Sequence, residues 1–349
     1  MQHDVPQARI SLGLGIDAGG TGTRWALAEP SGKVSATGSV AGLTALMMGS
    51  EAGRDQIGQA IRQLSSALHE VLAGRIGPDG GQPPQMPQRV FAGFTAYSED
   101  PPLRARIEAL VANALDLPAE RVCVCGDIAL AYLDCFEPAA GYLVYAGTGS
   151  IAAYIDVDGR LHRAGGRGGL LDDGGSGYWI AREAMRHIWR AEDEQPGNWR
   201  GSTLAASVFE HVGGSEWARS RDFFYQGTRG QVGEMAQAVA VAAVQGDAVA
   251  LRLLARAGAE LARLATALTR RFGTRPIVLA GRAVQLHPAI EQGMREALGP
   301  TVALRAVRLH AHKTAARLAA NDAAVMRQLV AAELAAVQET AGPRGAGDA

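Results

Sequence analysis

Residues 12–34 read LGLGIDAGGTGTRWALAEPSGKV, and residues 141–161 read GYLVYAGTGSIAAYIDVDGRL. In each stretch an apolar run enters a short turn of Gly and Thr or Ser, a second apolar run follows, and another glycine turn closes the pattern. Gly20-Thr21-Gly22-Thr23 and Gly147-Thr148-Gly149-Ser150 stand 127 residues apart, and the closing glycines repeat at the same spacing. Such self-similarity indicates a duplicated structural unit. Chance likeness of two glycine-rich turns is the alternative, because few residues match.

Around these stretches, strand-like and helix-like runs alternate, which is typical of an α/β architecture. The predicted strands cover 10–17, 89–94 and 121–124, and the predicted helices cover 51–72, 102–115, 247–272 and 314–337. We predict two lobes, residues 1–136 and 137–340, with a cleft between them. Residues 77–88 are expected to form a Gly/Pro-rich loop, and the helix at 314–337 can pack back on the N-terminal lobe. Residues 341–349 are expected to be a frayed tail.

Composition excludes several classes of protein. The 349 residues carry 34 Lys and Arg against 35 Asp and Glu, a net charge of -1, which does not suit binding to a nucleic-acid backbone or an anionic membrane. No apolar run reaches the roughly 18 residues of a membrane span, and the first ten residues lack the order of a signal peptide. A cytoplasmic location is therefore expected.

Cysteine and histidine give no clear metal site. Cys123, Cys125 and Cys135 are too few for a disulfide framework and include no CxxC pair, so ordinary core thiols are expected, with metal or redox chemistry as the alternative. His310 and His312 have no carboxylate or Cys beside them at the spacing of a zinc site. We predict that both are surface residues.

Two segments fit the dinucleotide pattern G-x-G-x-x-A, Gly13 to Ala18 and Gly147 to Ala152. A dinucleotide site needs these glycines to open a helix, but residues 24–28 and 152–157 read as strands. The pattern is therefore expected to be a decoy. Glycine still lets a backbone approach phosphate closely, so two such turns could clamp a polyphosphate from both sides.

Two aspartates follow predicted strands. Asp17 precedes the first turn, whereas the second copy has Val144 at that position. An unmatched carboxylate beside a phosphate turn suggests that Asp17 holds Mg²⁺ through water, with turn stabilisation as the alternative. Asp127 begins a predicted helix, so it is a candidate catalytic base or a helix N-cap, and the two roles are compatible.

Residues 165–179 are predicted to form a glycine-dense loop before a helix at 180–189. Ordering so many glycines costs backbone entropy, which suggests a close ligand or lobe contact, with a purely structural loop as the alternative. Within it, Asp173 could accept hydrogen bonds from a polyol and Ser176 could cap the helix.

Together these segments resemble the N-acetylglucosamine kinase-like branch of the actin-like ATPase superfamily, the BadF/BadG/BcrA/BcrD type. The resemblance rests on Asp17-Ala18-Gly19-Gly20-Thr21-Gly22-Thr23-Arg24, Gly126-Asp127, Ala146-Gly147-Thr148-Gly149-Ser150 and Gly174-Gly175-Ser176-Gly177-Tyr178-Trp179-Ile180. It implies two ribonuclease H-like lobes with an interlobe nucleotide cleft, ATP with Mg²⁺, and phosphoryl transfer to an amino sugar.

The resemblance also implies roles for individual residues. Nucleotide binding falls to Asp17, Gly19, Gly20, Thr21, Thr23, Gly147, Thr148, Gly149, Ser150 and Gly281, with Asp17 also at the metal. Asp127 would be the base that takes the sugar hydroxyl proton. Sugar binding falls to Thr95, Asp173, Thr44 and Arg167. The loop containing Thr44 lacks the Asn of many relatives, Arg167 replaces a Trp of several sugar kinases, and Gly174 replaces a common Glu.

We therefore predict an ATP-dependent kinase of an amino sugar such as N-acetylglucosamine or glucosamine, with a small-molecule sugar as partner and a homodimer left open. Because the sugar-binding residues depart from the family pattern, two alternatives stay open: a nucleotide-binding regulatory protein, or an ATPase that acts on a partner protein. The family's dehydratase activators ligate an iron-sulfur cluster, and the cysteine spacing here does not suit that use.

Overall fold

The computed structural model describes residues 11–73, 86–98, 100–321 and 324–340. Most of the predicted Gly/Pro-rich loop, and the tail at 341–349, lie outside these residues. The chain divides into two compact units. The first unit comprises Met1–Asp134, Ile155–Leu161 and His310–Ala349, and the second comprises Cys135–Tyr154 and His162–Leu309.

The first unit contains a five-stranded sheet in the order β3-β2-β1-β4-β5. Its strands are β1 (Gly13–Gly19), β2 (Gly22–Ala28), β3 (Val34–Val40), β4 (Arg89–Phe94) and β5 (Val122–Gly126). Its helices are α1 (Glu51–Ala73), α2 (Pro101–Leu115), α3 (Asp127–Leu133), α11 (Ala311–Ala320) and α12 (Ala324–Thr340), with 3-10 turns at Ala45–Gly49 and Ala119–Arg121. β1 pairs antiparallel with β2 and parallel with β4, so the sheet is mixed.

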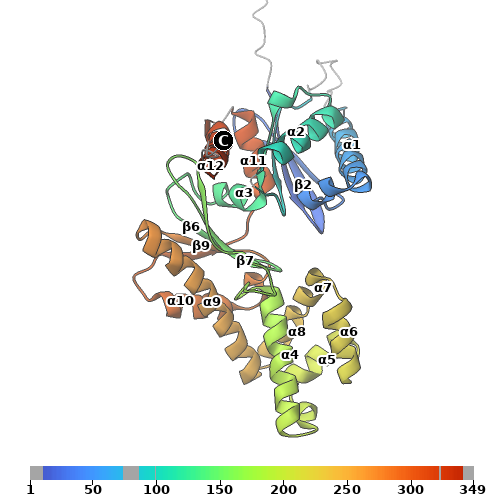
Figure 1. Cartoon of the computed structure of the whole chain (residues 1–349), viewed down its shortest axis with the longest axis vertical. Coiled ribbons are helices and arrows are strands. Elements are labelled where there is room, and N and C mark those ends of the chain that lie inside the picture. Colours follow the sequence, from blue (N-terminus) through green and yellow to red (C-terminus); the bar gives the residue numbers. More distant parts are fainter. Residues whose placement is uncertain (1–10, 74–85, 99, 322–323, 341–349) are drawn as a thin grey trace, which may run out of the picture. The chain divides into compact units, whose positions relative to one another are not determined.

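The two faces of this sheet are covered by different helices (Figure 1). Side chains alternate along a strand, so Leu14 and Ile16 point one way while Gly13 and Gly15 point the other. Leu14 and Ile16 join a core cluster with apolar residues of α1 and α2. The opposite face receives α11, which packs on β1 and β2.

Gly13 and Gly15 let the α11 backbone lie directly on the sheet. A Cβ on Gly15 would fall 2.1 Å from the carbonyl oxygen of His312, and one on Gly13 would fall 2.1 Å from the backbone nitrogen of Ala320. The dinucleotide-like pattern in this strand is thus a helix-packing surface, as its interpretation as a decoy predicted. β2 (Gly22–Ala28) confirms that a strand follows the turn.

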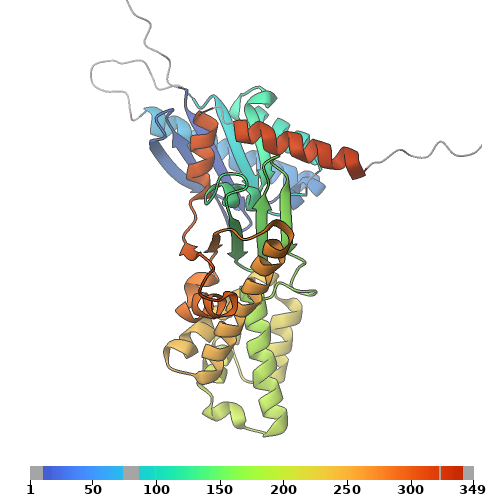
Figure 2. The ribbon, with the colours of Figure 1, turned by 90° about the vertical axis from the view of Figure 1, so that its left-hand side faces the viewer.

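The prediction of a single helix at 314–337 is wrong. The structure has two helices, because α11 ends at Ala320 with Asn321 as its C-cap and α12 starts at Ala324. They run in different directions (Figure 2). α12 packs against β5 and contributes Glu333, which accepts hydrogen bonds from Tyr97 Oη at 2.5 Å and Arg104 Nη1 at 3.0 Å.

The second unit repeats the strand topology of the first. Its sheet order is β10-β9-β6-β7-β8, and read from β8 the connectivity is that of β3-β2-β1-β4-β5. The strands are β6 (Tyr142–Ala146), β7 (Ser150–Ile155), β8 (Leu161–Gly165), β9 (Ile277–Ala280) and β10 (Leu304–Val307). β6 pairs antiparallel with β7 and parallel with β9, as β1 does with β2 and β4. The predicted duplication and α/β class are confirmed.

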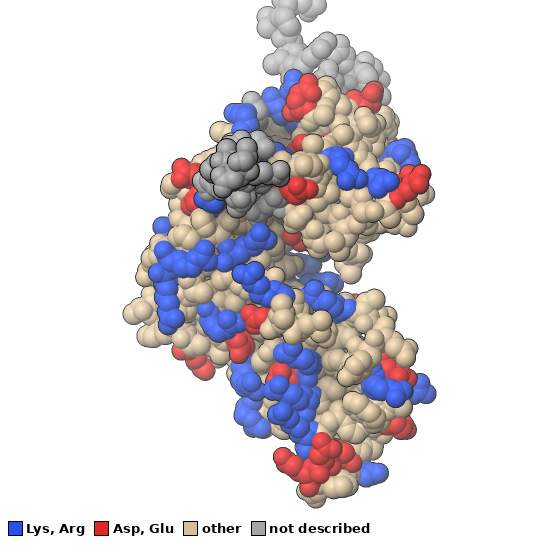
Figure 3. All heavy atoms as spheres, viewed as in Figure 1, with Lys and Arg blue, Asp and Glu red and all other residues tan. Residues whose placement is uncertain are grey.

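Six helices stand between β8 and β9, and one between β9 and β10, within the described part of the second unit. They are α4 (Gly177–Glu194), α5 (Thr203–Val212), α6 (Trp217–Gln226), α7 (Arg229–Glu234), α8 (Ala236–Val244), α9 (Ala248–Phe272) and α10 (Pro288–Leu298), with 3-10 turns at Asn198–Gly201 and Val284–Leu286. Basic side chains gather on the surface where α4 and α9 lie (Figure 3). Across the described ranges, no helix is both long and apolar enough to cross a membrane.

Candidate functional site

The first glycine turn is the tip of the β1–β2 hairpin. Gly19 pairs with Gly22, which leaves Gly20 and Thr21 exposed at the tip. The next loop packs on this tip, because the backbone N–H of Leu43 donates to the Gly19 carbonyl at 3.0 Å. The turn therefore presents backbone groups and the Thr21 hydroxyl to solvent, while the hydrogen bond from Leu43 holds its base in place.

Thr44 lies beside this turn. Its Cγ2 atom would be 3.4 Å from a Cβ on Gly20, and its successor Ala45 donates a backbone hydrogen bond to the carbonyl of Thr95 at 3.0 Å. Thr95 in turn donates its backbone N–H to Ala18 at 2.9 Å. The structure thus brings Thr44 and Thr95, both predicted for sugar binding, to the end of β1.

Thr95 also holds Asp127. Its hydroxyl donates to Asp127 Oδ2 at 2.7 Å. The N-cap of α3 is Gly126, so Asp127 is the first helical residue rather than the expected cap. Burial raises the pKa of Asp127, and the hydrogen bonds from Thr95 and the Ile128 backbone oppose this shift. The result is an oriented carboxylate of increased basicity at the carboxyl end of β5.

Asp17 lies two residues before the turn on β1, on the α11 side of the sheet. Burial raises its pKa to about 6, with a further contribution from the negative charge of Asp127, while Arg24 acts in the opposite direction. The negative charge of Asp127 thus disfavours ionisation of Asp17, and a cation bound nearby would favour it. Within the described residues no group of three or more His, Cys, Asp or Glu could form a metal site. This donor set fits Mg²⁺ held mainly by water and phosphate rather than by a protein cage.

Thr23 differs from the rest of the first turn. Its side chain is fully buried, and within the described residues its hydroxyl has no hydrogen-bond partner. The hydroxyl that the first turn offers to solvent is therefore that of Thr21.

The second turn, Gly147–Gly149, joins β6 to β7 and is one residue longer than the first, because Ala146 pairs with Ser150. Its carbonyls are already used: Gly147 accepts from Gly177 N–H at 2.9 Å and Thr148 accepts from Tyr178 N–H at 3.2 Å. The buried Ser150 hydroxyl donates to the Gly174 carbonyl at 2.7 Å. The start of α4 therefore braces this turn.

Gly281 lies against this second turn. It has φ +110°, and a Cβ there would fall 2.2 Å from the carbonyl oxygen of Ala146. Only glycine fits such a close approach in this backbone conformation. Gly281, predicted for nucleotide binding, and the second turn are thus adjacent in one unit.

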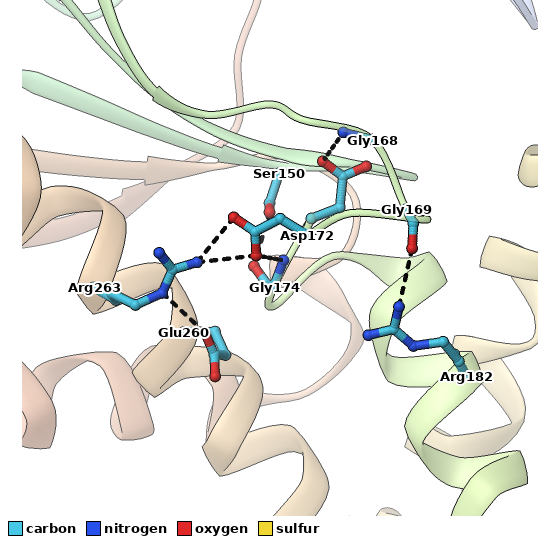
Figure 4. Close-up of polar contacts among 9 residues, drawn as sticks. Ser150, Gly168, Gly169, Asp172, Gly174, Arg182, Glu260 and Arg263 are labelled. Atoms are coloured by element: carbon cyan, nitrogen blue, oxygen red, sulfur yellow. Dashed lines mark hydrogen bonds and ion pairs between the residues drawn. The ribbon is translucent and has the colours of Figure 1, made fainter.

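The glycine-dense loop is held by arginines from several helices. Arg263 of α9 donates to both oxygens of Asp172 at 3.0 Å, and Arg182 of α4 donates to the Gly169 carbonyl at 2.9 Å (Figure 4). Ser176 accepts from Trp179 N–H at 3.1 Å, which confirms its prediction as the α4 cap. Arg167 is exposed on the loop.

Asp173 is only 2% exposed, and both of its oxygens are engaged. Arg229 donates to Oδ2 at 2.5 Å and Gly168 N–H donates to Oδ1 at 3.2 Å. Its role in holding a sugar stays a prediction. Sequence reasoning missed Arg229, since nothing in the sequence marks a pairing across 56 positions.

The prediction for His312 is wrong. His310 is exposed, but His312, in the first turn of α11, is buried with its Nδ1 atom unpaired within the described part of the chain. Burial, together with the charges of Arg24 and Lys313, lowers its pKa to about 4. The periodicity of a helix that lies on a sheet could have indicated this burial.

The expectation of core thiols holds for Cys125, which is buried, whereas Cys123 and Cys135 are half-buried. Burial raises the pKa of Cys123 to about 12. A separate cavity of about 330 Å³ in the helical part of the second unit includes none of the predicted site residues. Its lining comprises His211, Asp222, Phe223, Gln226, Gly227, Gln231 and Glu234.

Comparison with known proteins now gives the family. The model of the BadF/BadG/BcrA/BcrD ATPase family matches residues 14–314, which include both turns and Asp127. The chain belongs to this family. The resemblance predicted from the sequence motifs is therefore confirmed for the BadF/BadG/BcrA/BcrD ATPases.

Individual relatives of this BadF/BadG/BcrA/BcrD ATPase are distant. An N-acetylmuramic acid/N-acetylglucosamine kinase of Clostridium acetobutylicum is 27% identical over 143 residues, which cover 40% of this chain and only 46% of that enzyme. A protein of Chromobacterium violaceum assigned as an N-acetylglucosamine kinase has a similar fold, with TM-score 0.66, 24% identity, and coverage of 89% of this chain and 100% of the other. A ROK family glucokinase of Streptomyces griseus, solved with glucose and AMPPNP, gives TM-score 0.53 and 20% identity over 90% of this chain and 99% of the other. These structures share the two-lobe α/β fold.

Proposed function

We propose that this protein is an ATP-dependent kinase of an amino sugar of the N-acetylglucosamine class. The observation that carries the proposal is the Thr95–Asp127 pair beside Asp17 and the Gly20-Thr21 tip. A kinase of a sugar hydroxyl needs a base and phosphate-binding groups, and little other covalent chemistry. The family match and the sugar kinases among its relatives support this substrate class.

In the proposed reaction, the sugar hydroxyl oxygen attacks the γ-phosphorus of ATP and the bond to the leaving ADP oxygen breaks. Asp127 accepts the hydroxyl proton, and Thr95 orients its carboxylate. The raised pKa of Asp127 suits a base, because basicity closer to neutral pH favours proton transfer. The backbones of Gly20 and Thr148 would bind phosphate oxygens, and Gly281 would lie near adenosine.

Mg²⁺, when bound, would neutralise phosphate charge, and Asp17 would hold it through water. The buried Thr23 contributes to the shape of the turn in this scheme. A cytoplasmic location belongs to the same proposal and rests on the sequence expectation alone, and the homodimer stays open.

The test is Asp127→Asn, which keeps the shape of the side chain but removes the base. ADP release with N-acetylglucosamine or glucosamine should fall by about 10² to 10⁴-fold, while ATP binding measured by calorimetry stays close to wild type. Asp116→Asn is the matched control, because Asp116 is an exposed residue of the same unit with φ +54°, which Asn tolerates. Turnover by Asp127→Asn at the wild-type rate would remove Asp127 as the base.

One observation favours the alternative of a nucleotide-binding regulatory protein. Asp173, the expected sugar ligand, is buried and paired with Arg229. A screen of ADP release over amino and neutral sugars, with and without Mg²⁺, separates the two functions. A kinase shows sugar-dependent release, whereas a regulator binds ATP and releases ADP at one rate with every sugar.

A further inference from the structure

Arg229 joins a buried carboxylate to the second glycine turn. Its Nη2 atom lies 2.5 Å from Asp173 Oδ2, and the Asp173 side chain is 2% exposed while that of Arg229 is 56% exposed. A guanidinium has five N–H donors, and within the described residues only this contact of Arg229 is found. One end of the arginine is therefore fixed, and further donors face outward.

The Nη2 end of Arg229, which Asp173 holds, adjoins the turn. A Cβ placed on Gly149 would lie 2.8 Å from Asp173 Oδ2 and 3.2 Å from Arg229 Nη2. α7 reaches the same turn one helical turn later, since a Cβ on Gly233 would lie 3.3 Å from Thr148 Cγ2. Residues 229 and 233 share one helix face, so α7 presents Arg229 to the turn from a docked position.

The second turn has no positively charged side chain of its own. The first N–H groups of α4 donate to the carbonyls of Gly147 and Thr148, and the Ser150 hydroxyl donates to Gly174. The turn itself contains no Lys or Arg. A phosphate bound there would thus meet little positive charge from the turn, and Arg229 is placed to supply it.

The conformation and burial of Asp173, the carboxylate that anchors Arg229, cost folding free energy. Asp173 has φ +53°, an uncommon conformation for a residue with a Cβ, and its charge is buried. Strained, buried groups of this kind concentrate at functional sites. The neighbouring pair, Asp172 with Arg263, is more open, with side-chain exposures of 28% and 54%, and Arg263 also binds Glu260.

We propose that Arg229 is a phosphate-binding residue of the second turn, held in place by Asp173, that donates to the phosphate chain of a nucleoside triphosphate. This inference rests on the proposed function. The planar fork of arginine can keep one N–H on Asp173 while others bind phosphate oxygens, which a lysine could not reproduce. Asp173 is then a positioning residue rather than a sugar ligand.

The experiment compares Arg229→Gln, Arg229→Lys and the control Arg263→Gln by calorimetry with MgATP and with adenosine. Arg229→Gln should weaken MgATP binding by about 10 to 100-fold and change adenosine binding less than about twofold, because only ATP carries the phosphates. Arg229→Lys keeps the charge beside Asp173 and should recover part of the loss. Arg263→Gln removes an arginine from the same loop and should bind both ligands as the wild type does.

Three results would overturn this inference and leave the proposed function intact. They are an unchanged MgATP affinity in Arg229→Gln, equal losses of affinity for MgATP and adenosine in Arg229→Gln, or a loss of MgATP affinity in Arg263→Gln as large as that in Arg229→Gln. If Arg229→Gln does not fold, the Arg229→Lys variant decides. Unchanged MgATP affinity and full activity of Arg229→Lys would contradict a contact that needs the planar guanidinium of arginine. A wild-type chain that binds adenosine and MgATP equally would overturn the proposed function and this inference together.

Discussion

The two hairpins share one topology but differ at the positions that face their surroundings. Counted back from the pair that closes each turn, Asp17 corresponds to Val144 and Gly15 to Tyr142. In the first unit this face carries two glycines, a helix backbone and a carboxylate. In the second unit Tyr142 packs edge-on against Tyr154 at 5.4 Å between ring centroids, and Val144 is fully buried.

This difference separates what builds the fold from what performs the chemistry. Alternation of apolar residues and a glycine turn are common to both hairpins, and they account for the antiparallel pairing of β1 with β2 and of β6 with β7. The carboxylate with a raised pKa occurs in one copy only, at a position where the other copy has an apolar side chain. In the proposed scheme the first unit would therefore supply the acid–base and metal-binding groups, and the second unit would bind phosphate through its backbone and Arg229.

The largest effect is expected where α11 lies on the glycines. Gly15→Ala would place a Cβ 2.1 Å from the His312 carbonyl oxygen and 2.2 Å from the Ala316 nitrogen, both backbone atoms that cannot rotate away. We expect a loss of about 3 kcal/mol or more in the free energy of unfolding, measured by denaturant titration. Gly49→Ala is the control, because no atom lies within 4 Å of a Cβ there. Equal stability of the two variants would contradict the packing of α11 on β1.

The next prediction tests the difference between Asp17 and Val144, the equivalent positions of the two hairpins. In the proposed scheme Asp17 holds Mg²⁺ through water, so Asp17→Asn should reduce Mg²⁺-dependent turnover by about 10 to 100-fold. It should also stabilise the protein near neutral pH. A carboxyl whose folded pKa is raised to about 6 favours the folded state below its unfolded pKa of 3.8 and loses that contribution as pH rises through 6.

The stability gain of Asp17→Asn over wild type should therefore grow by about 1 kcal/mol between pH 5 and pH 8, as measured by urea titration at each pH. Val144→Thr is a control on the other hairpin, where no charge titrates. A gain that shrinks toward pH 8 would show that Asp17 is stabilised as a carboxylate, contrary to the burial that raises its pKa.

Much of this arrangement was predictable because it is local in sequence. The turns, the strands around them and the cap at Ser176 follow from glycine spacing, apolar runs and a hydroxyl before a helix. Asp127 was found because it starts a helix after a strand. The pairing of Asp173 with Arg229 and the contact of Glu333 with Tyr97 join residues far apart in the sequence, and no local pattern specifies such partners. The burial of His312 depends on the glycines of a distant strand, which only the tertiary fold brings together.

The last effect, on stability alone and without a change in turnover, concerns His312, whose position depends on the glycine face that the second hairpin lacks. Its pKa is lowered to about 4 by burial and by Arg24, Lys313 and His310, with Asp134 opposing them. Because the unfolded chain takes up a proton near pH 6.5 and the folded chain does not, stability should fall as pH drops from 6.5 toward 4. His312→Gln removes this titration, so the wild type should lose about 1 to 2 kcal/mol more than the variant between pH 8 and pH 5. His310→Gln, an exposed neighbour, should retain the wild-type slope. If His312→Gln follows the same curve as the wild type and His310→Gln, the His312 ring of α11 is not held neutral in the folded protein, contrary to the burial that lowers its pKa.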